Sequence, residues 1–414
     1  MTIRHLYPVV EPSLNLDFAN SRKLDPRITF TRASTGTYTD ESGIIRTAAA
    51  NEARFDHDGD GNSLGLLIEE SRTNQVLNSD TMVRGGEAIT SGMTVTANAT
   101  TAPDGVSASA DLVVPTIASG IHQIYKNPAN YTGTSGTLSL FVKASGYTKV
   151  IISAGTNSAG HTAFDISGNG SLLYKGSNVV AHSIQKLGNG WFRISTTNAA
   201  HPNAYRYHVI IPDPSYTTGT PAVWSGDGTS GMYMWGLQFE EGSFPTSYIP
   251  TTSSTVTRSA DVASMTGTNF SSWYNQSEGT FYSKGDLTYS YSGSNTFRSI
   301  LVGGTFPSRR WAWSMIESLN RLTAATDGMD HGDFYTGMSR NIPNNFNIAQ
   351  AIKNTATTNV SSAADGVITG SRTGFSSYTI SSIQIGINSF TGHLSRLTYY
   401  PVRLPDGTLQ ALTL

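Results

Sequence analysis

The chain has 414 residues, more than one hydrophobic core usually serves, so two or three domains are expected. Charged residues make up only 14% of the sequence, against roughly 25% in an average domain, and the formal net charge is −2. A chain so close to neutral has no field that would gather DNA, RNA or an anionic membrane. We therefore expect no nucleic-acid partner and no membrane insertion.

Cysteine is absent, which excludes disulfides, thiolate metal sites and a cysteine nucleophile. The opening residues, MTIRHLYPVVEPSL, contain no apolar run as long as that of a signal peptide. No later window approaches the ~18 apolar residues of a membrane span. If the protein acts outside cells, we expect it to leave by lysis or as part of an assembled particle.

Short alternating apolar runs bounded by Gly, Asn, Asp, Ser or Pro recur along the chain, a pattern typical of antiparallel sandwiches and barrels. The clearest predicted strands, in chain order, are residues 137–144, 149–155, 191–196, 205–212 and 232–242. The last strand carries four apolar side chains at the two-residue spacing of one strand face, which we expect to be core: Tyr233, Trp235, Leu237 and Phe239.

The most distinctive stretches are LDFANSRKLDPRITFTRASTGTYTD (16–40) and LGLLIEESRTN (64–74). They resemble the opening module of phage-type fibre and head-spike proteins, a family that includes the head spikes of gene transfer agents. The resemblance is close over roughly the first 75 residues and is architectural beyond them. It implies an attachment module over residues 1–80 that docks the subunit to a capsid or spike-adaptor protein.

The rest of the chain divides into two predicted sandwiches. Residues 81–258 end in a segment that resembles the closing strand and exit of carbohydrate-binding jelly-roll modules, and the polar run 251–260 indicates a linker. Residues 259–414 resemble a concanavalin- or laminin-G-like sandwich and close with a predicted helix over 406–414, for which Asp406 is a candidate N-cap. The predicted fold class is all-β, with an N-terminal module followed by two antiparallel β-sandwich domains.

The segment FDHDGDGNSLGLLIEE (55–70) begins like a calcium loop, in which alternating oxygen ligands precede a glycine. Its candidate Ca²⁺ ligands are Asp56, Asp58 and Asp60. The twelfth position, where such a loop needs a bidentate glutamate, holds Leu67. A metal-free, Asp- and Gly-rich turn is the competing and favoured interpretation.

A second acidic segment, DGMDHGDFY (327–335), brings together Asp330, His331 and Asp333. These side chains could coordinate calcium or hydrogen-bond vicinal sugar hydroxyls, and concanavalin-type lectins often bind ligand at such a loop. The glycines of the segment suit a solvated connection between strands equally well.

Tryptophans matter because sugar rings stack on aromatic planes. Trp224, in AVWSGDGTSG, and the pair Trp273 and Tyr274, in SSWYNQS, fall in loop-like sequence, so each is a candidate sugar platform. Trp191 and Trp235 fall inside apolar alternation and are expected in the core.

Trp311 and Trp313 are two apart in RRWAWSM and so share one strand face. They could line a glycan groove in which Arg309 meets an anionic sugar. Filling the interior of the sandwich is the competing and favoured interpretation.

No catalytic constellation is recognisable, since G-x-S-x-G, H-E-x-x-H and phosphate-binding glycine loops are all missing. The sequence therefore predicts a non-catalytic spike or fibre subunit, expected to be homo-oligomeric, on the surface of a virion or gene transfer agent particle. It would bind host capsular polysaccharide or lipopolysaccharide and so promote adsorption through many weak contacts. A polysaccharide depolymerase, a structural capsid decoration protein and an ordinary soluble lectin are the alternatives.

Overall fold

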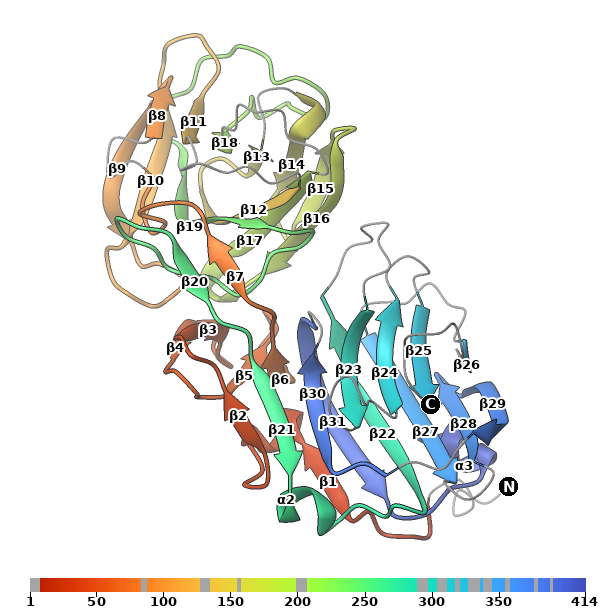
Figure 1. Ribbon diagram of the computed structural model, residues 1–414. Coiled ribbons are helices and arrows are strands. Elements are labelled where there is room, and N and C mark those ends of the chain that lie inside the picture. Colours follow the sequence, from red (N-terminus) through yellow and green to blue (C-terminus); the bar gives the residue numbers. More distant parts are fainter. Residues whose placement is uncertain are drawn as a thin grey trace.

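The computed structural model describes residues 8–82, 88–126, 135–154, 158–198, 207–288, 297–303, 311–316, 321–326, 336–337, 345–353, 358–375, 379–387 and 390–414. Within these residues the fold is two antiparallel β-sandwiches joined by a narrow ribbon (Figure 1). The predicted all-β class is confirmed. Among the described residues no helix has the length and apolar character needed to cross a membrane.

We call the first body the terminal sandwich, because it is built from residues 8–74 and 256–414. One of its sheets has the order β29 (Val367–Phe375), β28 (Thr358–Ala364), β27 (Asn345–Lys353), β22 (Glu278–Leu287), β31 (Gly392–Tyr400), β6 (Ser63–Ile68) and β5 (Arg54–His57), with β1 (Leu14–Asp17) also paired to β31. The other has the order β2 (Thr29–Thr31), β21 (Val262–Thr266), β30 (Ser382–Ile387), β23 (Phe297–Gly303), β24 (Trp311–Ile316), β25 (Arg321–Thr326) and β26 (Thr336–Gly337).

The second body, residues 75–255, is the inserted sandwich. Its β12 sheet has the order β16 (Val179–Lys186), β17 (Phe192–Asn198), β12 (Gly136–Ser145), β19 (Gly231–Glu241), β10 (Ala110–Pro115) and β9 (Met93–Thr100). Its β13 sheet has the order β15 (Ser171–Lys175), β14 (His161–Asp165), β13 (Lys149–Ala154), β18 (Tyr207–Ile210), β11 (Gln123–Lys126) and β8 (Ala88–Ser91). All five strands singled out in the sequence are present, as β12, β13, β17, β18 and β19.

Small elements complete the fold. These are the hairpin β3 (Gly36–Thr39) and β4 (Ile45–Ala48), the ribbon β7 (Arg72–Asn74) and β20 (Val256–Arg258), the helices α1 (Phe18–Ser21), α2 (Thr268–Ser271) and α3 (Asp406–Leu412), and the 3₁₀ turns Ser158–Gly160 and Gly188–Gly190. The predicted C-terminal helix is confirmed as α3, but its N-cap is Pro405, so that Asp406 lies in the first turn and not at the cap. The predicted linker 251–260 contains the strand β20, which pairs with β7.

The N-terminal strands do not form a sheet of their own. Leu14 pairs with Tyr399 between β1 and β31, and Leu66 pairs with Leu394 between β6 and β31. In Figure 1 the red N-terminal strands accordingly lie beside the blue C-terminal ones. The structure thus differs from the predicted independent module over residues 1–80, because these strands complete the sandwich that residues 259–414 alone would leave open.

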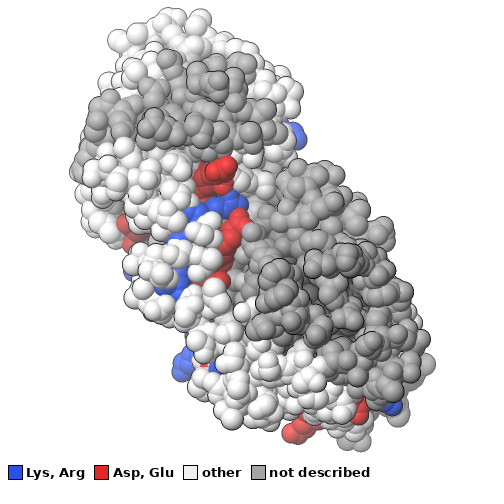
Figure 2. Space-filling view, viewed as in Figure 1, with Lys and Arg blue, Asp and Glu red and all other residues white. Residues whose placement is uncertain are grey.

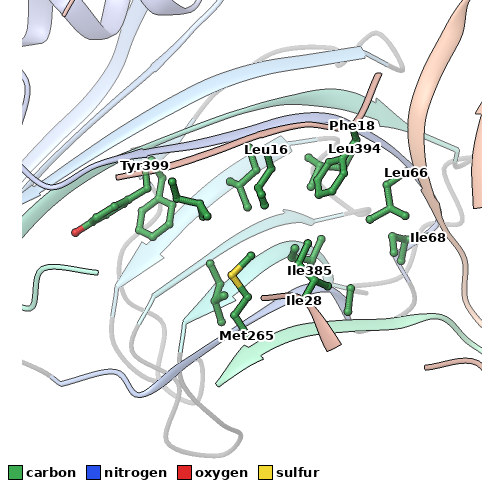
Figure 3. Packing of buried hydrophobic residues seen from close by; sticks show 14 of the residues in the cluster. Leu16, Phe18, Ile28, Leu66, Ile68, Met265, Ile385, Leu394 and Tyr399 are labelled. Carbon is green, nitrogen blue, oxygen red and sulfur yellow. The ribbon is translucent and has the colours of Figure 1, made fainter. Parts of the chain in front are cut away.

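The hydrophobic core of the terminal sandwich shows the same mixing. Leu16 and Phe18 pack with Leu66 and Ile68 from the N-terminal part and with Met265, Ile385, Leu394 and Tyr399 from the C-terminal part (Figure 3). Every side chain in this list is buried. Removal of the N-terminal strands would therefore expose part of this core to water.

A β-bulge corrects the predicted facing of β19. Gly236 has φ +66°, and the register between β12 and β19 shifts between Ser139 and Phe141. An extra residue in one strand reverses the alternation beyond it. Leu237 therefore packs in the core between the two sheets of the inserted sandwich, whereas Trp235 packs in a separate cluster on the other face.

That second cluster joins the two bodies. It contains Trp191, Trp235 and Tyr248 of the inserted sandwich and Ile45 of the β3–β4 hairpin. The expectation that Trp191 and Trp235 are buried is confirmed. Because Ile45 comes from the terminal part of the chain, the hairpin serves as an apolar contact between the sandwiches.

Candidate functional site

The outer face of the β12 sheet is rich in hydroxyl groups. Leu138, Leu140 and Ile194 point into the core, so the residues between them point to the opposite face. On that face Ser139 lies opposite Ser195, which lies opposite Ser183 on the next strand. A row of serines thus crosses three strands.

Hydrogen bonds between these side chains fix their positions. The Oγ atoms of Ser183 and Ser195 are 2.6 Å apart, and the Oγ1 atoms of Thr137 and Thr197 are 2.7 Å apart. Cross-strand hydroxyl pairs of this kind stabilise a sheet modestly and limit side-chain rotation. Ser139, Ser195, Thr137 and Thr197 are almost fully buried, whereas Ser183 is exposed. The face is therefore a fixed array of hydroxyls, and Ser183 is the member of this set that a polar ligand can reach.

A cavity of about 350 Å³ lies between this face and the terminal sandwich. Hydroxyl side chains form the largest group in its lining: Thr37, Tyr38, Thr39, Ser183, Ser195, Thr197, Ser243, Thr246, Ser247, Tyr248, Thr288 and Thr391. Figure 2 shows that blue and red side chains gather at the waist between the two bodies, whereas most other described surface in that view is white. We call this cavity the cleft.

Arg193 on β17 contributes a positive charge to the cleft. Its Nη2 donates to Ser139 Oγ (3.1 Å), and its guanidinium carbon lies 5.2 Å from the centre of the Phe141 ring. Burial lowers the pKa of Arg193, and the attraction of Glu240, the strongest among the carboxylates, does not make up for it. Arginine nevertheless stays protonated, so a cation faces the cleft.

His393 on β31 lies between two carboxylates, in the wall of the cleft that the terminal sandwich forms. Its Nδ1 is 2.9 Å from both carboxylate oxygens of Asp286, and its Nε2 is 3.1 Å from Asp56 Oδ2. Burial disfavours the imidazolium, but the two carboxylates outweigh it and raise the pKa of His393 to about 10. The group is thus a charged link between β5, β22 and β31.

A buried ion network, which we call the junction network, meets the cleft at Glu69. Arg54 Nη1 donates to Glu69 Oε2 (2.7 Å), and Arg32 Nη1 donates to Asp261 Oδ1 (3.0 Å). Arg54 also pairs with Asp261, and Arg258 Nε lies 3.3 Å from Glu69 Oε2. All five side chains are almost fully buried.

The junction network also reaches the inserted sandwich. Glu69 accepts hydrogen bonds from the backbone N–H of Ser247 (2.7 Å) and from its Oγ (2.6 Å). Burial alone would raise the pKa of Glu69, but Arg258 and Arg54 hold it far below its usual range. Sequence reasoning missed this network, because partners such as Arg32 and Asp261 are distant in the chain and no local motif links them.

The predicted calcium ligands have other partners. Asp56 accepts from the Thr39 N–H and bonds His393, while Asp58 accepts from the backbone and the amide of Asn62 in a tight turn. Asp60 donates its N–H to Asp58. In the described part of the chain, no group of three or more His, Asp and Glu side chains could hold a metal ion. The geometry favours the turn interpretation, and calcium binding stays a prediction.

Trp273 is core and not a surface platform, which corrects one predicted site. Its side chain is only 4% exposed, its Nε1 donates to Asn269 O (2.8 Å), and its ring lies 5.1 Å from that of Tyr399. Tyr274 is half-buried and stacks on Phe270. The loop-like sequence misled because the short helix α2 turns these rings inward.

Trp224 remains partly exposed at the surface of the inserted sandwich. Its ring packs edge-on against His122 (4.8 Å between centres) and Tyr147 (5.3 Å). It does not line the cleft. Its role as a sugar platform stays a prediction for a separate surface.

For the remaining candidates the structure describes no side chain. Trp311 and Trp313 are placed in β24 by their backbone alone. Arg309, Asp330, His331 and Asp333 lie outside the described residues.

No family model matches the chain, and no curated protein matches it. Similar solved structures include the CBM40 module of the Ruminococcus gnavus IT-sialidase bound to alpha2,6 sialyllactose, which is 15% identical, covers 34% of this chain and 85% of that chain, and has a TM-score of 0.25. A Trypanosoma rangeli sialidase is 10% identical, covers 74% of this chain and 61% of that chain, and has a TM-score of 0.26. The LG1-3 region of the laminin alpha2 chain is 10% identical, covers 70% of this chain and 67% of that chain, and has a TM-score of 0.22. At these TM-scores the likenesses carry no argument about function.

Proposed function

We propose that this protein binds a cell-surface polysaccharide in the cleft between its two sandwiches, without cleaving it. The observation that carries the proposal is the set of hydroxyl side chains lining the cleft, several of which are already oriented by hydrogen bonds to one another. Sugars are recognised by such arrays, because each ligand hydroxyl can both donate and accept. A few fixed polar groups in a concave site are what a small polar ligand needs.

The charge state of the cleft supports a binding role more than a hydrolytic one. Glycoside hydrolysis by a carboxylate pair needs one carboxylic acid with a raised pKa, which can protonate the leaving oxygen. The pKa of Glu69, a carboxyl group of the lining, is shifted the other way by two arginines. Asp56 is held beside the His393 imidazolium. We expect the viscosity of a bound polysaccharide to stay constant on incubation with the protein.

The proposal includes a place for the chain on the surface of a virion or gene transfer agent particle. Its support is the resemblance of residues 16–40 and 64–74 to phage-type head-spike and fibre proteins. Attachment to a capsid or spike-adaptor protein and a homo-oligomeric state belong to the same proposal. Because these residues also build the terminal sandwich, a docking surface on them would belong to the same domain as one wall of the cleft.

The test uses purified full-length protein and capsulated and acapsular cells of one host. We expect binding to capsulated cells only. The variant Ser183→Tyr, on the exposed rim of the cleft, should lose this binding, whereas Ser171→Tyr, exposed on the distant strand β15, should keep it. Equal binding to both cell types would refute glycan recognition. Full binding by the Ser183 variant would refute the assignment to the cleft.

A further inference from the structure

Arg193 is an incompletely paired cation in the lining of the cleft. A guanidinium carries five N–H donors. Within the described residues the only acceptor for them is Ser139 Oγ, and Nε is buried with no partner. No carboxylate of the described chain forms an ion pair with this side chain within 4.0 Å.

The other charges of the cleft are matched within the protein. His393 has two carboxylates, and Glu69 has Arg54 and Arg258. Arg54 and Arg193 differ in how well their charge is compensated. Two carboxylates raise the pKa of Arg54 despite its burial, whereas burial lowers the pKa of Arg193. Keeping a partly desolvated guanidinium without a counter-ion costs free energy, which an arriving anion would offset.

Glu240 is the carboxylate that attracts Arg193 most strongly, yet its oxygens have other partners. Gln238 Nε2 donates to Glu240 Oε2 (2.7 Å), the Thr246 N–H donates to the same oxygen (2.9 Å), and the Thr246 hydroxyl bonds Oε1. This carboxylate is therefore fixed in the wall of the inserted sandwich. It lowers the cost of the nearby positive charge without occupying the donors of Arg193.

We propose that Arg193 binds the carboxylate of an acidic sugar, such as a uronic acid residue of the polysaccharide, while the exposed hydroxyl of Ser183 bonds the sugar ring. The planar fork of a guanidinium matches the two oxygens of a carboxylate, which a neutral sugar cannot offer. Phe141 supports the guanidinium from one face and keeps the fork in a fixed plane. This inference rests on the proposed function and adds the chemical class of the ligand.

The experiment compares capsular polysaccharide purified from the capsulated cells with the same polymer after chemical reduction of its carboxyl groups to alcohols. Wild-type protein should bind the native polymer and lose about ten- to hundred-fold in affinity for the reduced one, the range of a charge-assisted hydrogen bond. Arg193→Gln should show the same loss on the native polymer and no further loss on the reduced one. Arg396→Gln, which removes an exposed arginine of the terminal sandwich, is the matched control and should bind as wild type.

The arms separate the possible failures. Equal wild-type affinity for native and reduced polymer would overturn the carboxylate assignment and leave glycan binding intact, and this arm needs no variant. Arg193→Lys keeps the charge but loses the fork, so wild-type binding by a folded Lys variant would also overturn the inference. Competition by dextran sulfate as strong as by the native polymer would show an unspecific anion site. No binding of either polymer would refute the proposed function itself.

Discussion

Replacing Glu69 by glutamine tests whether the junction network holds the two sandwiches together. Glu69 receives hydrogen bonds from Arg54 and from Ser247, and it lies beside Arg258. A glutamine of nearly the same shape removes the negative charge but leaves both arginines in place. The variant therefore isolates the charge from the packing.

The expected magnitude follows from burial. Removing one member of a buried ion pair costs about 3–5 kcal/mol, because the remaining charge is left uncompensated. Glu41→Gln is the control, since it breaks the exposed pair of Glu41 with Arg22, whose side chains are 64% and 49% exposed. Surface pairs of this kind contribute about 0–1 kcal/mol.

The assay is urea unfolding followed separately by tryptophan fluorescence and by circular dichroism. With a slope of about 3 kcal/mol per molar urea, the Glu69 variant should unfold about 1 M earlier than wild type, and Glu41→Gln should be nearly unchanged. The two probes should separate for the Glu69 variant, because the sandwiches lose their shared network and unfold independently. A midpoint shift no larger than that of the Glu41 control would refute the reasoning.

The same residue predicts the acid sensitivity of the protein. The pKa of Glu69 is depressed in the folded state below its usual value of 4.5. Its contribution to stability is therefore fully present above pH 4.5 and is lost as the pH falls below that value. The free energy of unfolding of wild type should decline over this acidic range more steeply than that of Glu69→Gln. Parallel curves would show that Glu69 does not carry the acid dependence.

Three further predictions address other parts of the fold. The pKa of His393 is raised to about 10, so its contribution to the free energy of unfolding is complete below pH 6.5 and is lost as the pH rises towards 10. In His393→Gln the free energy of unfolding should therefore change less with pH over this range than in wild type. Gly236→Ala places a Cβ 2.6 Å from the Phe141 ring at a residue with positive φ, whereas Gly267, the control position, also has positive φ but open space around its Cβ. The Tm of Gly236→Ala should therefore lie well below that of Gly267→Ala. Equal Tm values would contradict the bulge. Deletion of residues 1–80 should leave the terminal sandwich unfolded, measured as loss of cooperative melting, and a folded truncated protein would contradict the strand pairing.

The strands of the inserted sandwich could be predicted because their signal is local. Residues 137–144 and 191–196 alternate apolar and polar side chains over one strand length, and that pattern alone indicates a half-buried strand. The same alternation concealed the bulge. A glycine in a strand can mark a bulge or a close approach, and only the pairing with β12 shows that Gly236 reverses the facing.

The topology of the terminal sandwich could not be predicted from local pattern. Leu14 pairs with Tyr399, and Phe30 pairs with Ala263, across most of the chain. The N-terminal stretch has a distinctive sequence, which suggested a separate module. Its buried residues in fact belong to a core that they share with residues from the C-terminal part, because β1 and β6 both pair with β31.

The cleft escaped prediction for a related reason. Its lining comes from β3, β5, β17 and β31 and from the exit of β19, and none of these segments carries a motif by itself. Serine and threonine on β17 looked like ordinary polar positions of a strand. Only the packing of the two sandwiches gives them a common space.

The insertion of one sandwich into the other has a mechanical consequence. The chain crosses from the terminal to the inserted sandwich along β7 and returns along β20, and these two strands are hydrogen-bonded to each other. A force that pulls the sandwiches apart is therefore shared between two covalent tethers that stretch together, and it applies no shear to the hydrogen bonds between them. The two sandwiches therefore bear more tension through this double strand than they would through a single linker of the same composition.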